Sequence, residues 1–104
     1  MSVLHLDSNN FEKNVSESEK PVIVDFWAEW CMPCKMFSPI VEQAAAELGD
    51  RAVVAKLNVD EAADIAMKYS VASIPTVIVF RDGKEATRAI GARSKDEVIG
   101  LLDM

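Results

Sequence analysis

Blocks of apolar residues separated by polar turns run along the whole chain and predict strands and helices in alternation. Val22–Trp27 is almost continuously apolar, which is typical of a central strand covered on both faces. Cys34–Leu48 has apolar residues at helical spacing. In this helix Pro39 predicts a kink, and Gly49 is expected at the C-terminal cap.

Shorter elements complete the alternation. Further strands are expected at Val3–Leu6, Ala52–Val59, Thr76–Phe80 and Glu85–Ile90, the last two joined by an Asp-Gly hairpin turn. A further helix is expected after the capping residues Ser8–Asn10, with Glu12 three places after Asn9, and runs to about Ser18. Two more are expected after Asp60, over 62–69, and after Ser94, which is spaced for a capping box with Glu97. The last helix is expected to turn its apolar side chains inward: Val98, Ile99, Leu101 and Leu102.

The element order is therefore β-α-β-α-β-α-β-β-α, which predicts an α/β fold: a mixed, five-stranded central sheet with helices on both faces. A chain of 104 residues is expected to form a single domain over 1–104, since domains run to about 100–150 residues. Val and Ile number 19 against 6 Leu, and this β-branched excess favours a buried sheet over a helical bundle.

Charge and hydropathy exclude several classes of partner. The 11 basic and 17 acidic residues leave a net charge of −6, which argues against nucleic acid and against anionic membrane surfaces. The longest apolar runs are far shorter than a membrane span. Met1–Asp7 has neither the basic head nor the apolar stretch of a leader peptide, so we expect a cytoplasmic protein or a mature form already trimmed.

The candidate chemistry lies in Cys31-Met32-Pro33-Cys34, between the predicted central strand and the helix after it. Two cysteines three positions apart on a first helical turn face the same side, at a separation that a disulfide accepts. The N–H groups and dipole of a helix N-terminus favour a thiolate, most strongly at Cys31, and Pro33 suits an early helical position. The pattern favours a redox-active pair over a structural disulfide, because so small a loop stabilises little.

Metal binding is the alternative for any such pair. A closed zinc site needs four Cys or His ligands, and the chain offers only Cys31, Cys34 and the distant His5. We therefore expect no metal. The methionines other than Met32 are expected to be core filler or to lie at the chain ends.

Asp25 interrupts the most apolar strand of the sequence. Its neighbours Val24 and Phe26 point to the opposite face, so Asp25 is expected to face one of the buried layers. Burial raises the pKa of a poorly paired carboxyl group, which can then exchange a proton near neutral pH. The alternative is a polar residue at a strand end that water reaches.

Several motifs occur together, in order, over nearly the whole chain. They are WCMPCK at 30–35, preceded by VDFWAE at 24–29 and followed by VAKLNVD at 54–60, SIPT at 73–76, Asp82-Gly83 and IGA at 90–92. In these motifs the chain resembles the thioredoxin family. The resemblance implies a thioredoxin fold and a protein-disulfide reductase, monomeric and without a bound cofactor. The redox-active disulfide Cys31–Cys34 would then act on disulfide-containing substrate proteins, and a thioredoxin reductase would recycle it.

The resemblance also implies roles for individual residues. Cys31 would be the exposed nucleophile, Cys34 the resolving cysteine, Asp25 the proton acceptor behind Cys34, and Lys56 the lysine that pairs with Asp25. Pro75 would be cis, leaving the Ile74 backbone free to pair with a substrate strand. A shallow substrate groove would be formed by Trp30, Met32, Pro33, Val59, Ile74, Pro75, Ile90, Gly91 and Ala92. Without the resemblance, Val59 and Ile90 fit core positions, and Gly91 would allow close backbone approach.

The chain departs from the family pattern at Met32, where most thioredoxins have Gly, and at Ala72-Ser73, where Arg-Gly is commoner. Residues between the two cysteines influence the redox potential, so Met32 is expected to alter the potential or the choice of partner. Two other functions stay open. One is a disulfide oxidase or isomerase of the same fold, and the other is a binding subunit whose cysteines are incidental.

Overall fold

The computed structural model describes residues 3–104, so Met1 and Ser2, which belong to the segment inspected for a leader peptide, lie outside the described residues. The strands are β1 Leu4–Leu6, β2 Val22–Trp27, β3 Val53–Asn58, β4 Thr76–Arg81 and β5 Lys84–Ile90. The helices are α1 Phe11–Ser16, α2 Met32–Leu48, α3 Ala63–Lys68 and α4 Lys95–Gly100, with short 3-10 turns at Gly49–Arg51 and Leu101–Asp103. Within this range, no helix has the length and apolar character needed to cross a membrane.

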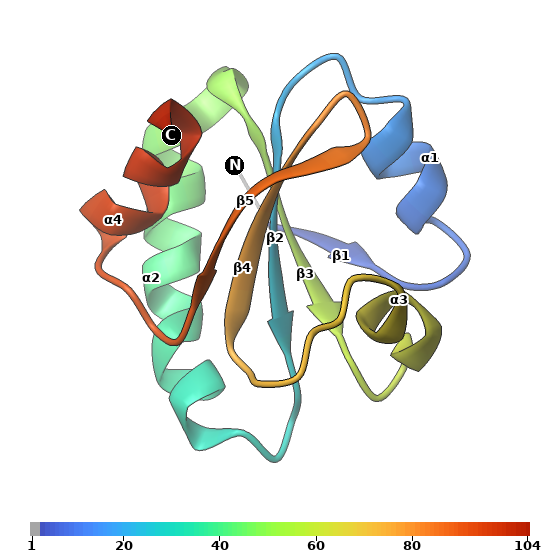
Figure 1. The fold of residues 1–104 in the computed structure, drawn as a ribbon. Coiled ribbons are helices and arrows are strands. Elements are labelled where there is room, and N and C mark those ends of the chain that lie inside the picture. Colours follow the sequence, from blue (N-terminus) through green and yellow to red (C-terminus); the bar gives the residue numbers. More distant parts are fainter. Residues whose placement is uncertain (1–2) are drawn as a thin grey trace.

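The strands form one five-stranded sheet in the order β1-β3-β2-β4-β5 (Figure 1). β1, β3 and β2 run parallel, whereas β4 is antiparallel to β2 and β5 is antiparallel to β4. The predicted mixed α/β sheet is confirmed. In the register of β2 and β3, Asp25 lies directly beside Lys56, and both therefore point to the same face.

Helices cover both faces of the sheet (Figure 1). On one face, α2 and α4 pack against the sheet in a core that includes Ile23, Val54, Val77, Phe37, Val41 and Val98. On the other face, α1 and the segment around α3 pack against Val22, Val24, Phe26, Leu57 and Phe80. Because β2 contributes to both cores, its nearly continuous apolar sequence is explained.

The capping predictions succeed at α4 and fail at α1 and α3. Ser94 and Glu97 form the predicted capping box, and Val98 and Leu101 are buried, with Ile99 and Leu102 packed against the same core. At α1 the N-cap position is Asn10, within the predicted Ser8–Asn10, but its Oδ1 accepts from the backbone N–H of Asp7 and makes no cap, and the helix runs only over Phe11–Ser16. Asp60 does not cap α3 either, since that helix begins at Ala63 without a side-chain cap.

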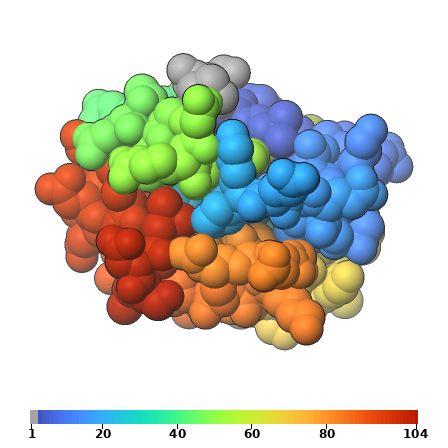
Figure 2. Space-filling view, turned by 90° about the horizontal axis from the view of Figure 1, so that it is seen from above, coloured from blue at the N-terminus to red at the C-terminus, as the bar shows by residue number. Residues whose placement is uncertain are grey.

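The hairpin between β4 and β5 matches the prediction from its Asp-Gly turn. Asp82 and Gly83 both have positive φ, 54° and 78°, as a tight hairpin of this kind requires. A Cβ atom added to Gly83 would lie 3.1 Å from the Cα of Ser16, so the turn packs closely against the end of α1. Figure 2 shows this end of the molecule, where the turn (orange) lies beside the blue segment that follows α1.

Candidate active site

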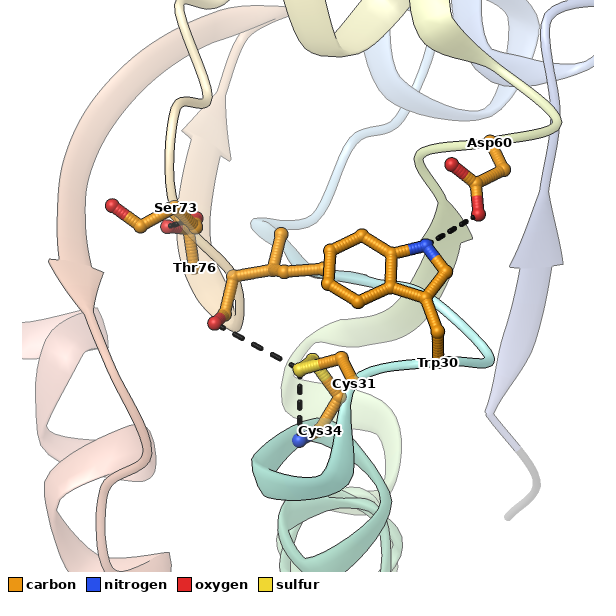
Figure 3. Close-up of a disulfide and its surroundings, with 7 residues drawn as sticks. Trp30, Cys31, Cys34, Asp60, Ser73 and Thr76 are labelled. Atoms are coloured by element: carbon orange, nitrogen blue, oxygen red, sulfur yellow. Dashed lines mark hydrogen bonds between the residues drawn. A yellow bond between two sulfur atoms is a disulfide. The ribbon is translucent and has the colours of Figure 1, made fainter.

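The two cysteines lie where β2 passes into α2. α2 begins at Met32, two residues earlier than predicted, because Cys31 itself is the N-cap and Pro33 occupies the first turn. The structure contains a disulfide between Cys31 and Cys34, with their Cα atoms 5.3 Å apart (Figure 3). The backbone N–H of Cys34 donates to the Sγ of Cys31 at 3.3 Å. A negative charge on Cys31 would therefore be stabilised directly by the helix N-terminus. Pro39 lies inside the continuous helix, and the kink stays a prediction.

Both cysteines are largely covered by their surroundings. Cys31 is 5% exposed and Cys34 is 1% exposed, so in the disulfide form Cys31 is the more accessible residue but not an exposed one. Together with Ala28, the cysteines form a small buried cluster against which Trp27, Val59 and Ile74 pack. Neither cysteine belongs to the two large cores, and Val59 and Ile74 connect this cluster to the core beneath α1 and α3.

Two segments distant in sequence meet at the cysteines. The Ile74–Pro75 peptide bond is cis, as the family resemblance implies, and the carbonyl oxygen of Ile74 lies 3.9 Å from the Sγ of Cys31. A disulfide sulfur carries no proton, so this approach is a contact rather than a donated hydrogen bond. The Gly91 N–H donates to the Pro75 carbonyl at 2.8 Å, which brings the end of β5 to the same place.

Trp30 stands out from the surface next to the disulfide. Its side chain is 70% exposed, and its Nε1–H donates to the Oδ2 of Asp60 at 2.9 Å (Figure 3). Asp60 was predicted only as a helix cap, and the sequence contains no signal that links it to Trp30. The bond fixes the orientation of a large apolar side chain that is otherwise open to a partner.

The remaining residues of the predicted groove divide by exposure. Met32, Pro33, Ile90 and Ala92 are exposed, Val59 and Ile74 are half-buried, and Pro75 is buried. The assignment of Ile90 to the core is therefore wrong, whereas Val59 does pack against buried residues. At Gly91 a Cβ atom would meet nothing within 4 Å, so a φ of +94° and not close backbone approach favours glycine there.

Exposed methionines correct another expectation. Met36 and Met67 are among the most exposed large apolar side chains of the described chain, so neither is core filler. Met104 is also exposed, at the chain end as expected. Met36 lies one helical turn after Met32 on α2, where the two exposed side chains share a face.

Asp25 is fully buried on the face of the sheet covered by α2. It is 0% exposed, and neither carboxylate oxygen accepts a hydrogen bond from the part of the chain that the structure describes. Burial raises the pKa of Asp25 from 3.8 to about 7, and the nearby positive charge of Lys56 offsets part of that rise. The prediction that this carboxyl group faces a buried layer is confirmed.

Lys56 lies beside Asp25 but makes other contacts. The side chain is buried, with 8% exposed, and its Nζ donates to the Oγ of Ser38 at 2.7 Å. The same Nζ lies 4.4 Å from the centre of the Trp27 ring. The described residues contain no ion pair between Lys56 and Asp25, so the direct pairing implied by the resemblance is absent. Ser38, on the partly exposed side of α2, was not predicted as part of the site.

The alternative of a zinc site finds no support within one chain. Among residues 3–104, no three His, Cys, Asp or Glu side chains come together as metal ligands would. Cys31 and Cys34 therefore do not share a site with His5, which lies on the edge strand β1.

The family model named Thioredoxin matches residues 2–104. The chain belongs to the thioredoxin family. It is 45% identical over 102 residues to a thioredoxin of Acidithiobacillus ferridurans, covering 98% of this chain and 94% of that protein. It is also 41% identical to a thioredoxin of Rickettsia bellii, over 95% of this chain and 94% of that protein. A thioredoxin of Pseudomonas aeruginosa is 40% identical, over 97% of this chain and 94% of that protein.

Family membership and the Cys31–Cys34 pair together define the activity. This member of the thioredoxin family is a dithiol–disulfide oxidoreductase that reduces protein disulfides by thiol–disulfide exchange. The fold predicted from the element order is the thioredoxin fold.

Proposed function

We propose that Cys31 is the nucleophile of this disulfide reductase and Cys34 the resolving cysteine. The observation that carries the assignment is the hydrogen bond from the Cys34 N–H to the Sγ of Cys31 at the start of α2, which favours a thiolate on Cys31. The Cys31 thiolate attacks one sulfur of a substrate disulfide. A new S–S bond forms, the substrate S–S bond breaks, and the second substrate sulfur leaves as a thiolate.

Cys34 completes the reaction with help from Asp25. The Cys34 thiol gives its proton to the Asp25 carboxylate, and the resulting thiolate attacks the Sγ of Cys31. This step forms the Cys31–Cys34 disulfide and releases the first substrate sulfur, so the substrate leaves with two reduced sulfurs. The pKa of about 7 at Asp25 supports the proposal, because a base titrating near neutral pH can take up and release a proton in each cycle. The nearby charge of Lys56 keeps that pKa from rising further.

Substrates are proposed to dock in the groove around the disulfide. Trp30 and Met32 beside Cys31, and Ile90 at the end of β5, provide exposed apolar surface, and Val59 and Ile74 line its floor. The residues Pro33, Pro75, Gly91 and Ala92 complete the same groove. The Ile74 backbone before Pro75 offers a short edge on which an extended substrate segment can form main-chain hydrogen bonds.

We further propose a setting for this thioredoxin. A dithiol reductase must be returned to its reduced form after every cycle, so its partners are disulfide-containing proteins on one side and a thioredoxin reductase on the other. Such a cycle suits a reducing compartment such as the cytoplasm, where the protein would carry electrons as a monomer and maintain redox balance. No bound cofactor is needed, since the two sulfurs hold both electrons.

Cysteine variants test the assignment of the two roles. Cys34→Ser should capture a test substrate such as insulin as a stable mixed disulfide through Cys31, whereas Cys31→Ser should capture none. Both variants should lose disulfide reduction with dithiothreitol as the electron source. Capture through Cys34 in the Cys31→Ser variant would reverse the roles, and partner activity retained by both variants would favour a redox-independent binding subunit.

The reduction potential of the Cys31–Cys34 pair separates a reductase from an oxidase. Equilibration with dithiothreitol or glutathione buffers should give a potential near the reducing end of the dithiol scale, at about −270 mV. A value near the oxidising end, at about −120 mV, would favour the oxidase alternative.

A further inference from the structure

The face of the sheet beneath α2 contains a lysine and an aspartate that are neighbours without being bonded. Asp25 and Lys56 lie side by side in the register of β2 and β3, and both side chains are buried. The ammonium group of Lys56 nevertheless donates to Ser38 of α2 and lies over the Trp27 ring. The Asp25 carboxylate is left without a hydrogen-bond donor among the described residues.

This arrangement needs a cause, because opposite charges attract strongly in a medium of low dielectric constant. A lysine side chain is long and flexible, so its ammonium group can form a hydrogen bond with any of several acceptors within reach. The Ser38 hydroxyl is the acceptor that holds it, at 2.7 Å. The Ser38 hydroxyl is thus the one hydrogen-bond acceptor that fixes the ammonium group among the described residues, and the Trp27 ring contacts the same group.

We propose that Ser38 is a positioning residue for disulfide reduction: its hydroxyl holds the Lys56 ammonium away from Asp25, so that the carboxylate stays free of an ion pair and can accept the Cys34 proton. The proposal rests on the proposed role of Asp25 in resolution. A direct ion pair with Lys56 would stabilise the ionised carboxylate and make it a weaker base. The Ser38 hydroxyl thus keeps the base effective without removing the neighbouring cation.

Few other charged groups on this face can produce the same effect. The neighbour of Asp25 on β4 is Val77, which is apolar, and α4 contributes Val98 to this layer. From α2 the buried titratable side chain is Cys34, which does not titrate while it is in the disulfide. The positive charge of Lys56 is the one that lowers the pKa of Asp25.

Removing the hydroxyl should release the lysine toward the aspartate. In Ser38→Ala, Lys56 loses its hydrogen-bond acceptor on α2, and the nearest anion in the adjacent strand is Asp25. An opposite charge within about 4–6 Å lowers the pKa of a carboxyl group by roughly 1–3 units. We expect the pKa of Asp25 to fall by at least about one unit. The acid limb of the pH profile for disulfide reduction should move to lower pH by the same amount.

The test is a carboxyl-carbon NMR titration of Asp25 in the oxidised 104-residue chain. Ser38→Thr keeps a hydroxyl at the same position and should retain the unmodified protein's pKa. Gln43→Ala changes an exposed side chain on the same helix and is the matched control, also expected to leave the pKa unchanged. An Asp25 pKa that stays constant or rises in Ser38→Ala would overturn the proposal.

A double-mutant cycle with Lys56→Met shows whether the effect passes through the lysine. Without the cation, Ser38→Ala should leave the pKa of Asp25 unchanged, and an equal fall in both backgrounds would contradict the mechanism. The titration uses the oxidised protein and does not require Asp25 to act in turnover. The rate of disulfide reduction by Asp25→Asn tests that role separately, so failure of the inference and failure of the proposed function can be told apart.

Discussion

Asp25 combines full burial with the absence of a hydrogen-bond donor among the described residues, and this has a consequence for stability. Below pH 3.8 the carboxyl group is protonated in the folded and the unfolded chain, and it adds no charge penalty. As the pH rises, the unfolded chain ionises first, so folding becomes less favourable until the folded pKa of about 7 is passed. Above that pH the carboxyl group is ionised in both the folded and the unfolded chain, so the loss of folding free energy no longer changes with pH.

The first prediction measures this penalty. A pKa that rises from 3.8 to about 7 on folding corresponds to about 4 kcal/mol of stability lost between those pH values. Asp25→Asn cannot ionise, so its unfolding free energy should lack that decline between pH 4 and pH 8. Urea denaturation of both proteins across this range measures the difference. Parallel pH profiles would show that Asp25 is not the group responsible.

The second prediction concerns Met32, the residue between Cys31 and Pro33. Met32 adds exposed apolar surface beside Cys31 and removes the backbone freedom of the glycine that most thioredoxins have there. Met32→Gly should therefore shift the redox potential of the pair or the rates with different partners, and a shift of 30 mV is about 1.4 kcal/mol. Equilibration with dithiothreitol and rates with two unrelated protein disulfides measure both. Identical potential and rates would remove any role for Met32.

For individual residues, the sequence predicted which side chains are reactive better than it predicted what those side chains contact. The spacing of Cys31 and Cys34 and the apolar neighbours of Asp25 were sufficient, because period and spacing fix which face each side chain occupies. The bond between Lys56 and Ser38 joins residues on a strand and a helix. That contact depends on how α2 lies on the sheet, which no local pattern specifies.

The elements show where local chemistry decides the conformation. Gly83 and Gly49 both have positive φ, but a Cβ atom would lie 3.1 Å from the backbone of Ser16 at Gly83 and would meet nothing within 4 Å at Gly49. Gly100 in α4 has neither constraint. Substitutions at these three glycines can therefore distinguish the cost of a positive φ from the cost of a steric contact.

The third prediction ranks alanine substitutions at these glycines. Gly49→Ala should cost about 1 kcal/mol for the positive-φ backbone alone, and Gly83→Ala about 2 kcal/mol because a steric contact adds to it. Gly100→Ala should be neutral or stabilise the protein by up to about 1 kcal/mol. Unfolding free energies from urea denaturation measure all three. An equal loss at Gly83 and Gly49 would mean that the close approach to Ser16 is relieved freely.

Sequence reasoning worked best for elements with strong patterns. The central strand was predicted to the residue, and the Asp-Gly turn and the Ser94 cap were both found, because each has a short-range physical signal. The failures are at α1 and α3. Asn10 and Asp60 have suitable side chains for caps, but the Asn10 Oδ1 accepts from the Asp7 N–H and the Asp60 carboxylate accepts from Trp30. Such competition is visible only when the chain is folded.

In the whole molecule, the two cysteines lie outside the two large cores, and Val59 and Ile74 link their small cluster to one of those cores. Ala28, Cys31 and Cys34 form their own buried group, and neither large core contains a cysteine. A disulfide over so few residues constrains the unfolded chain only slightly. Redox state and folding are therefore only weakly coupled.

The fourth prediction follows from this separation. Reducing the disulfide with dithiothreitol should leave the protein folded and lower its unfolding free energy by at most about 2 kcal/mol, the chain-entropy value for a loop this short. Denaturation in urea with and without reductant measures the difference. Cooperative unfolding on reduction alone would show that the disulfide is structural.

The segments around the disulfide are joined by backbone contacts from three directions. The Gly91 N–H bonds to Pro75, the Val59 N–H bonds to Trp27 at 2.8 Å, and the Ile74 carbonyl touches Cys31. The Trp30 side chain is also held, by its hydrogen bond to Asp60. Binding a partner therefore costs this surface little conformational entropy. The conformational adjustment of docking therefore falls on the substrate. Disulfides in mobile, solvent-exposed segments suit this surface better than disulfides enclosed in a rigid fold.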